Sequence, residues 1–312
     1  MIAALLVRWL DEWWSYLPAG IIEDLRDELG VTYAQAGWLI AIAFGGGLVG
    51  GPLGALADHV DRRRMAVTGG VLQTAGLATF ALGRSFPVLA LSMFVLGAAS
   101  DLVIRPLESG LAETSGDDLD RMLGRQHLLA FVGDFVGPAL LAIGAATALG
   151  WRGAFWITTA ALAVFTITLA SADFPPPQRP EADSTRALRG FTRMLRRPEV
   201  LWLALVEILL FPLDEPILGF AVARVASTGS HTVAQALAAG YVAGGIVGST
   251  YVDRRGVSRR AGTTGPLLLL AGAVGTAAAP EPIGAAVSMI FVGLGMAIVW
   301  TVGARTHAHC GS

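Results

Sequence analysis

The amino-acid sequence predicts an all-α polytopic membrane protein of about ten transmembrane helices. Three observations support this fold class. Of the 312 residues, 54% are hydrophobic and only 15% are charged, whereas a soluble domain carries roughly 25% charged residues. The 39 glycines agree, because glycine is more frequent in transmembrane helices than in soluble ones. Apolar stretches of roughly 20 residues, the length that crosses a bilayer, recur along the chain. Together these observations exclude an ordinary soluble enzyme.

Ten stretches meet the length criterion for a transmembrane span. They are residues 2–21, 34–56, 65–83, 87–112, 127–149, 153–171, 199–224, 233–252, 263–279 and 283–303. The first is not a cleavable signal peptide, because Arg8, Asp11 and Glu12 interrupt it and no small-residue cleavage site follows. The net charge of −2 indicates no general affinity for nucleic acid, and the single Cys310 cannot form an internal disulfide.

Arginines gather in alternate loops, and this asymmetry predicts the orientation of the chain. Clusters at residues 62–64 and 254–260 fall on one side, which is therefore cytoplasmic, while the first loop on the other side is acidic. Both termini are expected on the cytoplasmic face of the plasma (inner) membrane. The longest gap between spans is proline-rich and then basic, and is either a helix in the cytoplasmic interface or a solvated linker. The expected organisation is an N-terminal six-helix bundle (1–171), a cytoplasmic basic linker (172–198) and a C-terminal four-helix partial bundle (199–312).

The two parts of the sequence repeat one pattern. A glycine stands at every fourth position in span 34–56 and again in span 233–252, and such ladders let helix backbones approach closely in lipid. An acidic residue and an arginine cluster follow each ladder, and Leu-Asp-Glu occurs in both the first and the seventh span. Parallel halves joined by a basic loop are typical of one transporter architecture. The ladder glycines are Gly46, Gly50 and Gly54, then Gly240, Gly244 and Gly248.

On these motifs the chain resembles the major facilitator superfamily of transporters. That family's signature, Gly-x-x-x-Asp-(Arg)-x-Gly-Arg-Arg, occurs after span 34–56, with His59 and Asp61 in place of the usual arginine and glycine. A looser copy follows span 233–252, with Ser249 in the first glycine position. The resemblance implies that these loops latch alternate conformations through charge pairs at the cytoplasmic edge. The implied latch residues are Gly54, Asp58, Arg62, Arg63, Arg64, Asp253, Arg254, Arg259 and Arg260.

Two further stretches resemble the efflux branches of this superfamily. Gly133, Gly137 and Pro138 form a Gly-x-x-x-Gly-Pro motif similar to that of proton-driven antiporters, although Leu141 replaces a further glycine. The opening residues 9–42 resemble the fosmidomycin-resistance-like branch. The superfamily has twelve spans, so the chain is expected to lack the last two, either as a natural variant or as a truncated gene product.

Ionisable residues inside the predicted spans point to a polar pathway. Each would cost roughly 2.5–3.5 kcal/mol at the bilayer centre, so they are expected to pair or to face a wet cavity. The resemblance implies that the first, fourth, seventh and tenth spans line the central path, and all of these residues except Asp134 lie on the first, fourth and seventh. The predicted substrate and proton pathway comprises Arg8, Asp11, Glu12, Asp101, Arg105, Glu108, Asp134, Glu207, Asp214 and Glu215.

The seventh span places two adjacent carboxylates between Pro212 and Pro216. The prolines interrupt the helix and free backbone carbonyls for water or substrate. Adjacent carboxylates repel each other when both are ionised. One of Asp214 and Glu215 is therefore predicted to bind the coupled proton.

The expected function is secondary active transport by alternating access, with protons driving the export of a small organic compound. One alternative is an uptake permease of the same fold for a sugar or an organic acid, in which Arg105 binds an anionic group. Another is a non-transporting remnant or partner-binding membrane protein. The sequence contains no phosphate-binding loop, metal-ligand cluster or nucleophile motif, so no cofactor, metal site or enzymatic activity is expected. The expected partners are a small-molecule substrate, protons and the lipid bilayer, and the oligomeric state stays open.

Overall fold

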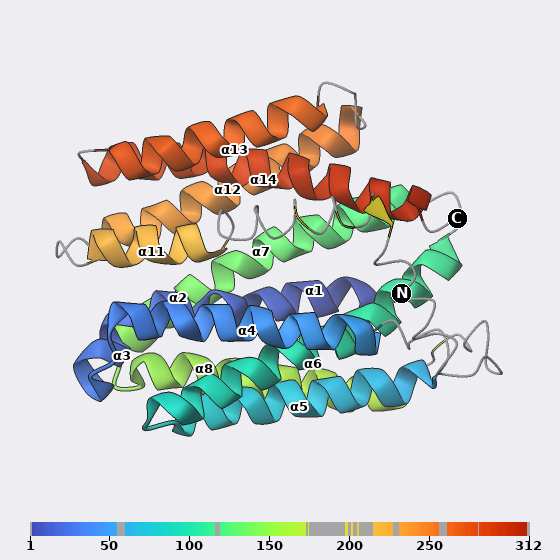
Figure 1. The fold of residues 1–312 in the computed structure, drawn as a ribbon, viewed down its shortest axis with the longest axis horizontal. Coiled ribbons are helices and arrows are strands. Elements are labelled where there is room, and N and C mark those ends of the chain that lie inside the picture. Colours follow the sequence, from blue (N-terminus) through green and yellow to red (C-terminus); the bar gives the residue numbers. More distant parts are fainter. Residues whose placement is uncertain are drawn as a thin grey trace.

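The structure is a computed structural model that describes residues 2–54, 60–115, 119–172, 174, 197–198, 201, 205, 215–226, 231–255, 261–279 and 281–310. Every regular element in these ranges is an α-helix, which confirms the predicted fold class. The helices lie roughly parallel in two groups, and the first residues of α1 and the last of α14 lie at the same end (Figure 1). The helices are α1 (Ile2–Ser15), α2 (Leu17–Gly20), α3 (Ile22–Leu29), α4 (Tyr33–Gly54), α5 (Arg62–Leu82), α6 (Phe86–Ser115), α7 (Leu119–Ala146), α8 (Gly150–Ser171), α11 (Glu215–Ala226), α12 (His231–Arg255), α13 (Ala261–Ala278) and α14 (Pro282–Cys310).

The helices follow the predicted spans closely. Within the described ranges, α4, α5, α6, α7, α8 and α14 are long and apolar enough to cross a membrane. Shorter apolar stretches, Ala236–Val252 and Thr263–Ala278, lie in α12 and α13. α1 with α2 corresponds to the first predicted span, and α11 to the end of the seventh. The predicted linker 172–198 lies almost wholly outside the described residues.

The first span differs from its prediction as one continuous helix. α1 ends at Ser15 and α2 begins at Leu17, with Pro18 in the first turn of α2. Proline lacks a backbone N–H, and its ring clashes with the carbonyl four residues earlier, so it favours a kink or a break in the helix, and here α1 stops before Pro18. The acidic loop predicted to follow is the short helix α3, which ends at Gly30 in the left-handed conformation that glycine adopts readily (φ 65°).

Both glycine ladders pack one helix tightly against another. Gly46 and Gly50 of α4 lie on the backbone of α6, where a Cβ on Gly50 would stand 2.5 Å from the carbonyl oxygen of Ala98. In the C-terminal half, a Cβ on Gly248 of α12 would stand 2.8 Å from the carbonyl oxygen of Leu294 in α14. The two ladders therefore make the same kind of contact in the two halves, as the repeat predicts.

The halves meet where α7 lies beside the C-terminal group of helices (Figure 1). The ring of Phe131 on α7 is 6.0 Å from that of Tyr241 on α12, and Gly245 leaves the space that the Phe131 ring fills. Close to the other end, Gly219 of α11 packs against Ala19 of α2. Small residues thus allow the halves to approach at two points.

A polar clamp ties α3 to α8 at the end of the bundle that bears α3. Arg152 donates to Glu28 over 2.6 Å, and the Trp151 indole donates to the other oxygen of the same carboxylate over 2.9 Å. Arg152 also donates to the carbonyl oxygens of Ala81 and Gly83 at the end of α5. The hydrogen bond from Arg152 is the main reason why the pKa of Glu28 lies below its ordinary value.

Replacing Gly46 by alanine should destabilise the fold, whereas the same change at Gly45 should not. A Cβ at Gly46 would lie 2.9 Å from the backbone nitrogen of Ala98, while nothing lies within 4 Å of a Cβ at Gly45. Forced overpacking costs about 1–3 kcal/mol. Thermal unfolding of the two purified variants in detergent measures the difference, and equal midpoints would contradict the packing.

The Glu28 clamp should lose its stabilising effect in acid. A carboxyl group whose pKa is lower in the folded state than in the unfolded state stabilises the fold at pH values above its unfolded-state pKa. This contribution disappears as the pH falls through its folded-state pKa. Glu28→Gln is therefore expected to lower the free energy of unfolding at neutral pH. The loss should be less than about 1 kcal/mol because the carboxylate is half exposed. The gap from wild type should close below about pH 4. Asp27→Asn, an exposed carboxylate on the same helix, serves as the control, and a gap independent of pH would refute the assignment.

Candidate functional site

An ion pair between α1 and α6 lies inside the membrane-spanning part of the N-terminal half. Nε and Nη2 of Arg8 donate to Oε1 of Glu108 over 3.1 and 2.9 Å. The two side chains are 26% and 21% exposed, so the pair is largely withdrawn from solvent. A charge in such a place is stable only with a partner. The pair therefore ties the first span to the fourth, as their predicted common role requires.

Arg105 extends this pair along the face of α6. Its Nε donates to Asp101 over 3.1 Å, and its Nη1 lies 3.4 Å from Oε2 of Glu108. These three residues follow at i, i+4 and i+7, so they share one face of the helix. Arg105 is the most exposed member of the network at 52%. Its guanidinium is thus the cation that a ligand can reach most easily.

Asp11 joins three helices through one carboxylate oxygen. Its Oδ1 accepts from the Trp14 indole over 3.0 Å, from Gln73 Nε2 of α5 over 2.9 Å and from the Ser100 hydroxyl of α6 over 2.8 Å. Glu12, the next residue, accepts from the hydroxyl of Ser15 over 3.2 Å. Asp11 and Glu12 therefore bond to different neighbours, although the sequence analysis grouped them together.

The Gly-x-x-x-Gly-Pro motif brings α7 against α1 beside this network. A Cβ on Gly133 would stand 2.9 Å from Cβ of Glu12, and one on Gly137 would stand 3.0 Å from the carbonyl oxygen of Trp13. The motif thus acts in packing, and it places the buried Asp134 next to the α1 contact. Pro138 lies within α7 and removes a hydrogen bond from the helix there.

Three of the predicted latch residues, Arg62, Arg63 and Arg64, make contacts within the N-terminal half. Arg62 is buried and holds Glu113 at the end of α6 through bonds of 2.6 and 2.5 Å. Arg63 donates to the carbonyl oxygen of Ala170 at the end of α8. Asp61, which departs from the family signature, caps α5 by accepting from the backbone N–H of Arg64 over 3.1 Å. The arginines thereby fasten the ends of α5, α6 and α8 to one another.

Four other predicted site residues lie at or near helix ends. Gly54 ends α4, Glu215 begins α11, Asp253 lies near the end of α12, and Arg254 beside it is exposed. The remaining residues lie outside the described ranges, and their roles stay predictions. They are Asp58, Glu207, Asp214, Arg259 and Arg260.

Four residues of the site escaped sequence reasoning. Gln73 and Ser100 bind Asp11, Glu113 binds Arg62, and the half-buried His127 on α7 lies near Arg8. Gln73 and His127 carried a usable signal, because a polar side chain inside an apolar span needs a partner. Ser100 did not, since serine is frequent in such helices.

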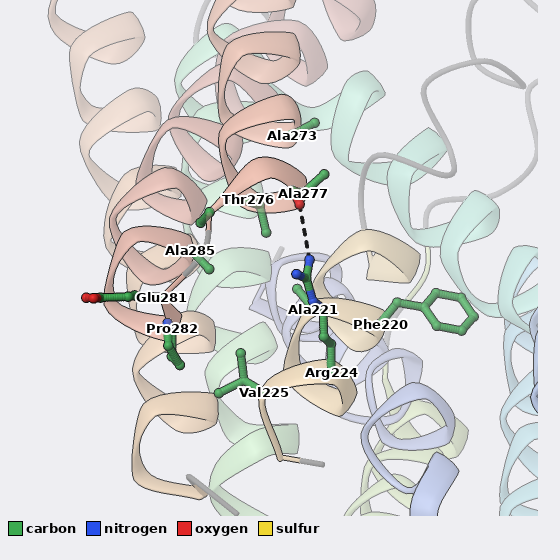
Figure 2. Close-up of a pocket in the computed structure, with 11 residues that line it drawn as sticks. Phe220, Ala221, Arg224, Val225, Ala273, Thr276, Ala277, Glu281, Pro282 and Ala285 are labelled. Carbon is green, nitrogen blue, oxygen red and sulfur yellow. Dashed lines mark hydrogen bonds between the residues drawn. The ribbon is translucent and has the colours of Figure 1, made fainter. Parts of the chain in front are cut away.

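A pocket of about 280 Å³ opens in the C-terminal half between α11, α13 and the start of α14. In Figure 2, Arg224 reaches across to the carbonyl oxygen of Ala277 over 3.1 Å, while Glu281 points away from it. The remaining lining is mostly apolar, with Phe220 and Val225 among its larger side chains. The pocket lies at the end of the bundle that bears α3 and contains none of the predicted pathway residues.

The fold and the charged network together define a polytopic helical membrane transporter. Comparison with known proteins agrees, since a family model described as Major Facilitator Superfamily matches residues 3–309. The chain therefore belongs to the major facilitator superfamily. This is a family of transporters, so the protein is a transporter and not an enzyme, as the sequence predicted.

A curated relative is similar to the chain in sequence, and solved structures are similar to it in fold. The chain is 30% identical over 296 residues to a chloramphenicol resistance protein of Streptomyces lividans. The aligned region covers 89% of this chain and 72% of that protein. The fold of the chain is similar to the partially occluded inward-open xylose transporter XylE from E. coli, with a TM-score of 0.75, 16% identity, and coverage of 96% of this chain and 81% of the other. A D-xylose–proton symporter structure gives a TM-score of 0.67 at 16% identity, covering 96% and 80%.

The Arg8–Glu108 pair should show energetic coupling. Either Arg8→Gln or Glu108→Gln leaves the other charge without its main partner, so each single variant is expected to be less stable than the double variant. Coupling energies for contacting residues run about 0.5–3 kcal/mol. The more exposed Arg26–Glu23 pair, 2.6 Å apart on α3, is the control, and its coupling should stay below about 1 kcal/mol. Strictly additive effects at Arg8 and Glu108 would refute the pair.

Proposed function

We propose that the protein exports a small organic compound across the plasma membrane in exchange for protons. The observation that supports this most is the charged network that α1 and α6 form inside their spans. Ionisable residues at such depth are rare, and they mark proton and substrate pathways. Carboxylates outnumber arginines in the network, so a proton has several acceptors there. The network comprises Arg8, Asp11, Asp101, Arg105 and Glu108.

Alternating access requires contacts that can open and close. Arg8–Glu108 joins two helices through side chains alone, so it can separate without unfolding either one. The Arg62–Glu113 pair offers a similar contact at the end that the arginine distribution assigns to the cytoplasm. In this proposal Asp58 and the arginines after it set the rate of the cycle, while the network in the spans binds substrate and proton.

The proton gradient can supply the required energy. One proton gains about 2.3 kcal/mol per 100 mV of membrane potential and about 1.4 kcal/mol per pH unit. Each 1.4 kcal/mol corresponds to a tenfold concentration ratio. A single proton can therefore sustain a substantial export gradient without nucleotide.

Export is favoured over uptake by the sequence relationships. One relative is named a chloramphenicol resistance protein, a name that fits export of the drug. The motif at Gly133, Gly137 and Pro138 resembles that of proton antiporters. Chloramphenicol is accordingly the first compound to test. Uptake of a sugar or organic acid is the competing function, favoured by the exposed guanidinium of Arg105 and by the fold of XylE, which is described as a proton:xylose symporter.

Reconstituted vesicles with an imposed pH step test both the direction and the coupling. Antiport predicts that chloramphenicol accumulates when the vesicle interior is acidic, whereas symport predicts accumulation when the exterior is acidic. No transport in either direction, across a panel of toxic compounds and sugars, would support a non-transporting protein.

The double variant Asp214→Asn with Glu215→Gln should abolish this accumulation but spare downhill exchange. We infer that one carboxylate of the pair carries the coupled proton, and a strongly interacting pair shares its protons, so neither single change is decisive. Exchange needs no net proton movement and therefore serves as the internal control for folding. Full accumulation by the double variant would move the proton site to Asp11, Glu12 or Asp134.

A further inference from the structure

A half-buried histidine on α7, His127, lies near the ion pair that joins α1 to α6. Within the described part of the chain, the Nδ1 atom of His127 is shielded from solvent and has no hydrogen-bond partner. Arg8 and Glu108 are the charged groups that act on its ring. A buried polar atom without a partner costs free energy, and in native proteins such an atom often marks a functional role.

The three residues lie at similar depth. Arg8 follows the start of α1 by six residues, Glu108 precedes the end of α6 by seven, and His127 follows the start of α7 by eight. With a rise of 1.5 Å per residue, these are roughly 9, 10 and 12 Å from helix ends on the same side of the bundle. The arginine distribution assigns that side to the cytoplasm. The ring is therefore near the cytoplasmic end of the predicted pathway.

The surrounding charges act on His127 in opposite ways. A protonated ring is repelled by Arg8 and attracted by Glu108. While the pair is closed, Arg8 bonds Oε1 of Glu108, and Oε2 has only the 3.4 Å contact with Arg105. The neighbouring α5 contributes the uncharged Gln73, which bonds Asp11, and α12 contributes Tyr241, which contacts Phe131 of α7. The other charged groups on α1, α6 and α7 are Asp11, Glu12, Asp101, Arg105, Glu113, Asp120, Arg121, Arg125 and Asp134.

We propose that His127 is a positioning residue that links protonation to the opening of the Arg8–Glu108 pair, and this rests on the proposed transport function. In the closed pair Arg8 opposes a second positive charge, so the ring stays neutral. When Arg8 moves away, Glu108 keeps only the 3.4 Å contact of Oε2 with Arg105, and the imidazole takes up one proton from water and donates an N–H to the vacated Oε1. Histidine is the side chain that ordinarily exchanges a proton near neutral pH.

The linkage works in both directions. If opening of the pair favours protonation of His127, protonation must favour the open pair by the same factor. A proton bound at the cytoplasmic end then releases the Arg8 guanidinium to face substrate. His127 therefore sets the pH range of the conformational cycle, whichever carboxylate carries the coupled proton.

The variant His127→Gln tests this because glutamine keeps a polar side chain but cannot titrate. Exchange of labelled chloramphenicol is measured in proteoliposomes at equal pH on both sides, where no gradient contributes. The wild-type rate should change about fivefold or more between about pH 5.5 and 8, within the usual range of coupling between sites. The variant should change less than about twofold. A variant that keeps the wild-type pH profile would overturn the proposal.

Two control variants separate titration from packing. Gln126 is the neighbouring residue and donates to the carbonyl oxygen of Ala4 over 2.8 Å, so Gln126→Leu disturbs the same α1–α7 contact without removing a titratable group. It should keep the pH profile, even if the rate falls. His231→Gln removes another histidine, in the C-terminal half, and should also keep it. Loss of the profile in either control would overturn the assignment to His127.

A measurement without substrate distinguishes this proposal from the transport function. Trp9, Trp13 and Trp14 lie on α1 next to Arg8 and Asp11, so their fluorescence should report a rearrangement of the pair during a pH titration of the purified protein. The transition should be present in the wild type and absent in His127→Gln. If chloramphenicol is not transported but this difference appears, the proposed substrate is wrong and the role of His127 stands. If the wild type shows no transition, or the variant retains it, the role of His127 is refuted.

Discussion

A charge inside the hydrocarbon of a bilayer must be paired or hydrated, and the N-terminal half is organised around that requirement. Arg8 and Glu108 neutralise each other across two helices, and Arg105 continues the pairing along α6. Asp11 is held by three neutral donors from α1, α5 and α6. The Arg8–Glu108 pair and the bonds from Gln73 and Ser100 to Asp11 each join different helices, so a movement of α1 relative to its neighbours changes these bonds together. That property suits a protein that must switch between two states.

Close helix approach makes the network possible. Side chains can bridge two helices only if the backbones are near, and lipid supplies no hydrophobic force to bring them together. Glycine removes the steric barrier at these contacts. Gly133 and Gly137 allow α7 to pack closely against α1, and Gly46 and Gly50 allow α4 to pack closely against α6. The same solution recurs between α12 and α14. The halves also pack closely where they meet, through Phe131 with Tyr241 and Gly219 with Ala19, and Tyr16 and Phe131 share a buried cluster with residues of α11 and α12.

Some of the candidate site was predictable and some was not. Asp101, Arg105 and Glu108 could be grouped in advance, because a spacing of i, i+4 and i+7 fixes one helix face whatever the surroundings. The family signature located Arg62 but not Glu113, since the two lie 51 residues apart and no local pattern relates them. Asp11 and Glu12 looked equivalent in the sequence. The structure separates them, because adjacent residues on a helix point in directions about 100° apart and meet different neighbours.

The sequence by itself determined the class of protein, the approximate spans, the glycine contacts and the set of charges that require partners. These follow from composition and from short-range periodicity, which act within a single helix. Only the tertiary structure decided which charges pair, that Pro18 divides the first span, that the acidic loop folds as α3 against Arg152, and that His127 lies beside Arg8. The reason is physical: such contacts join residues many positions apart, and their existence depends on how whole helices pack, which no local pattern contains.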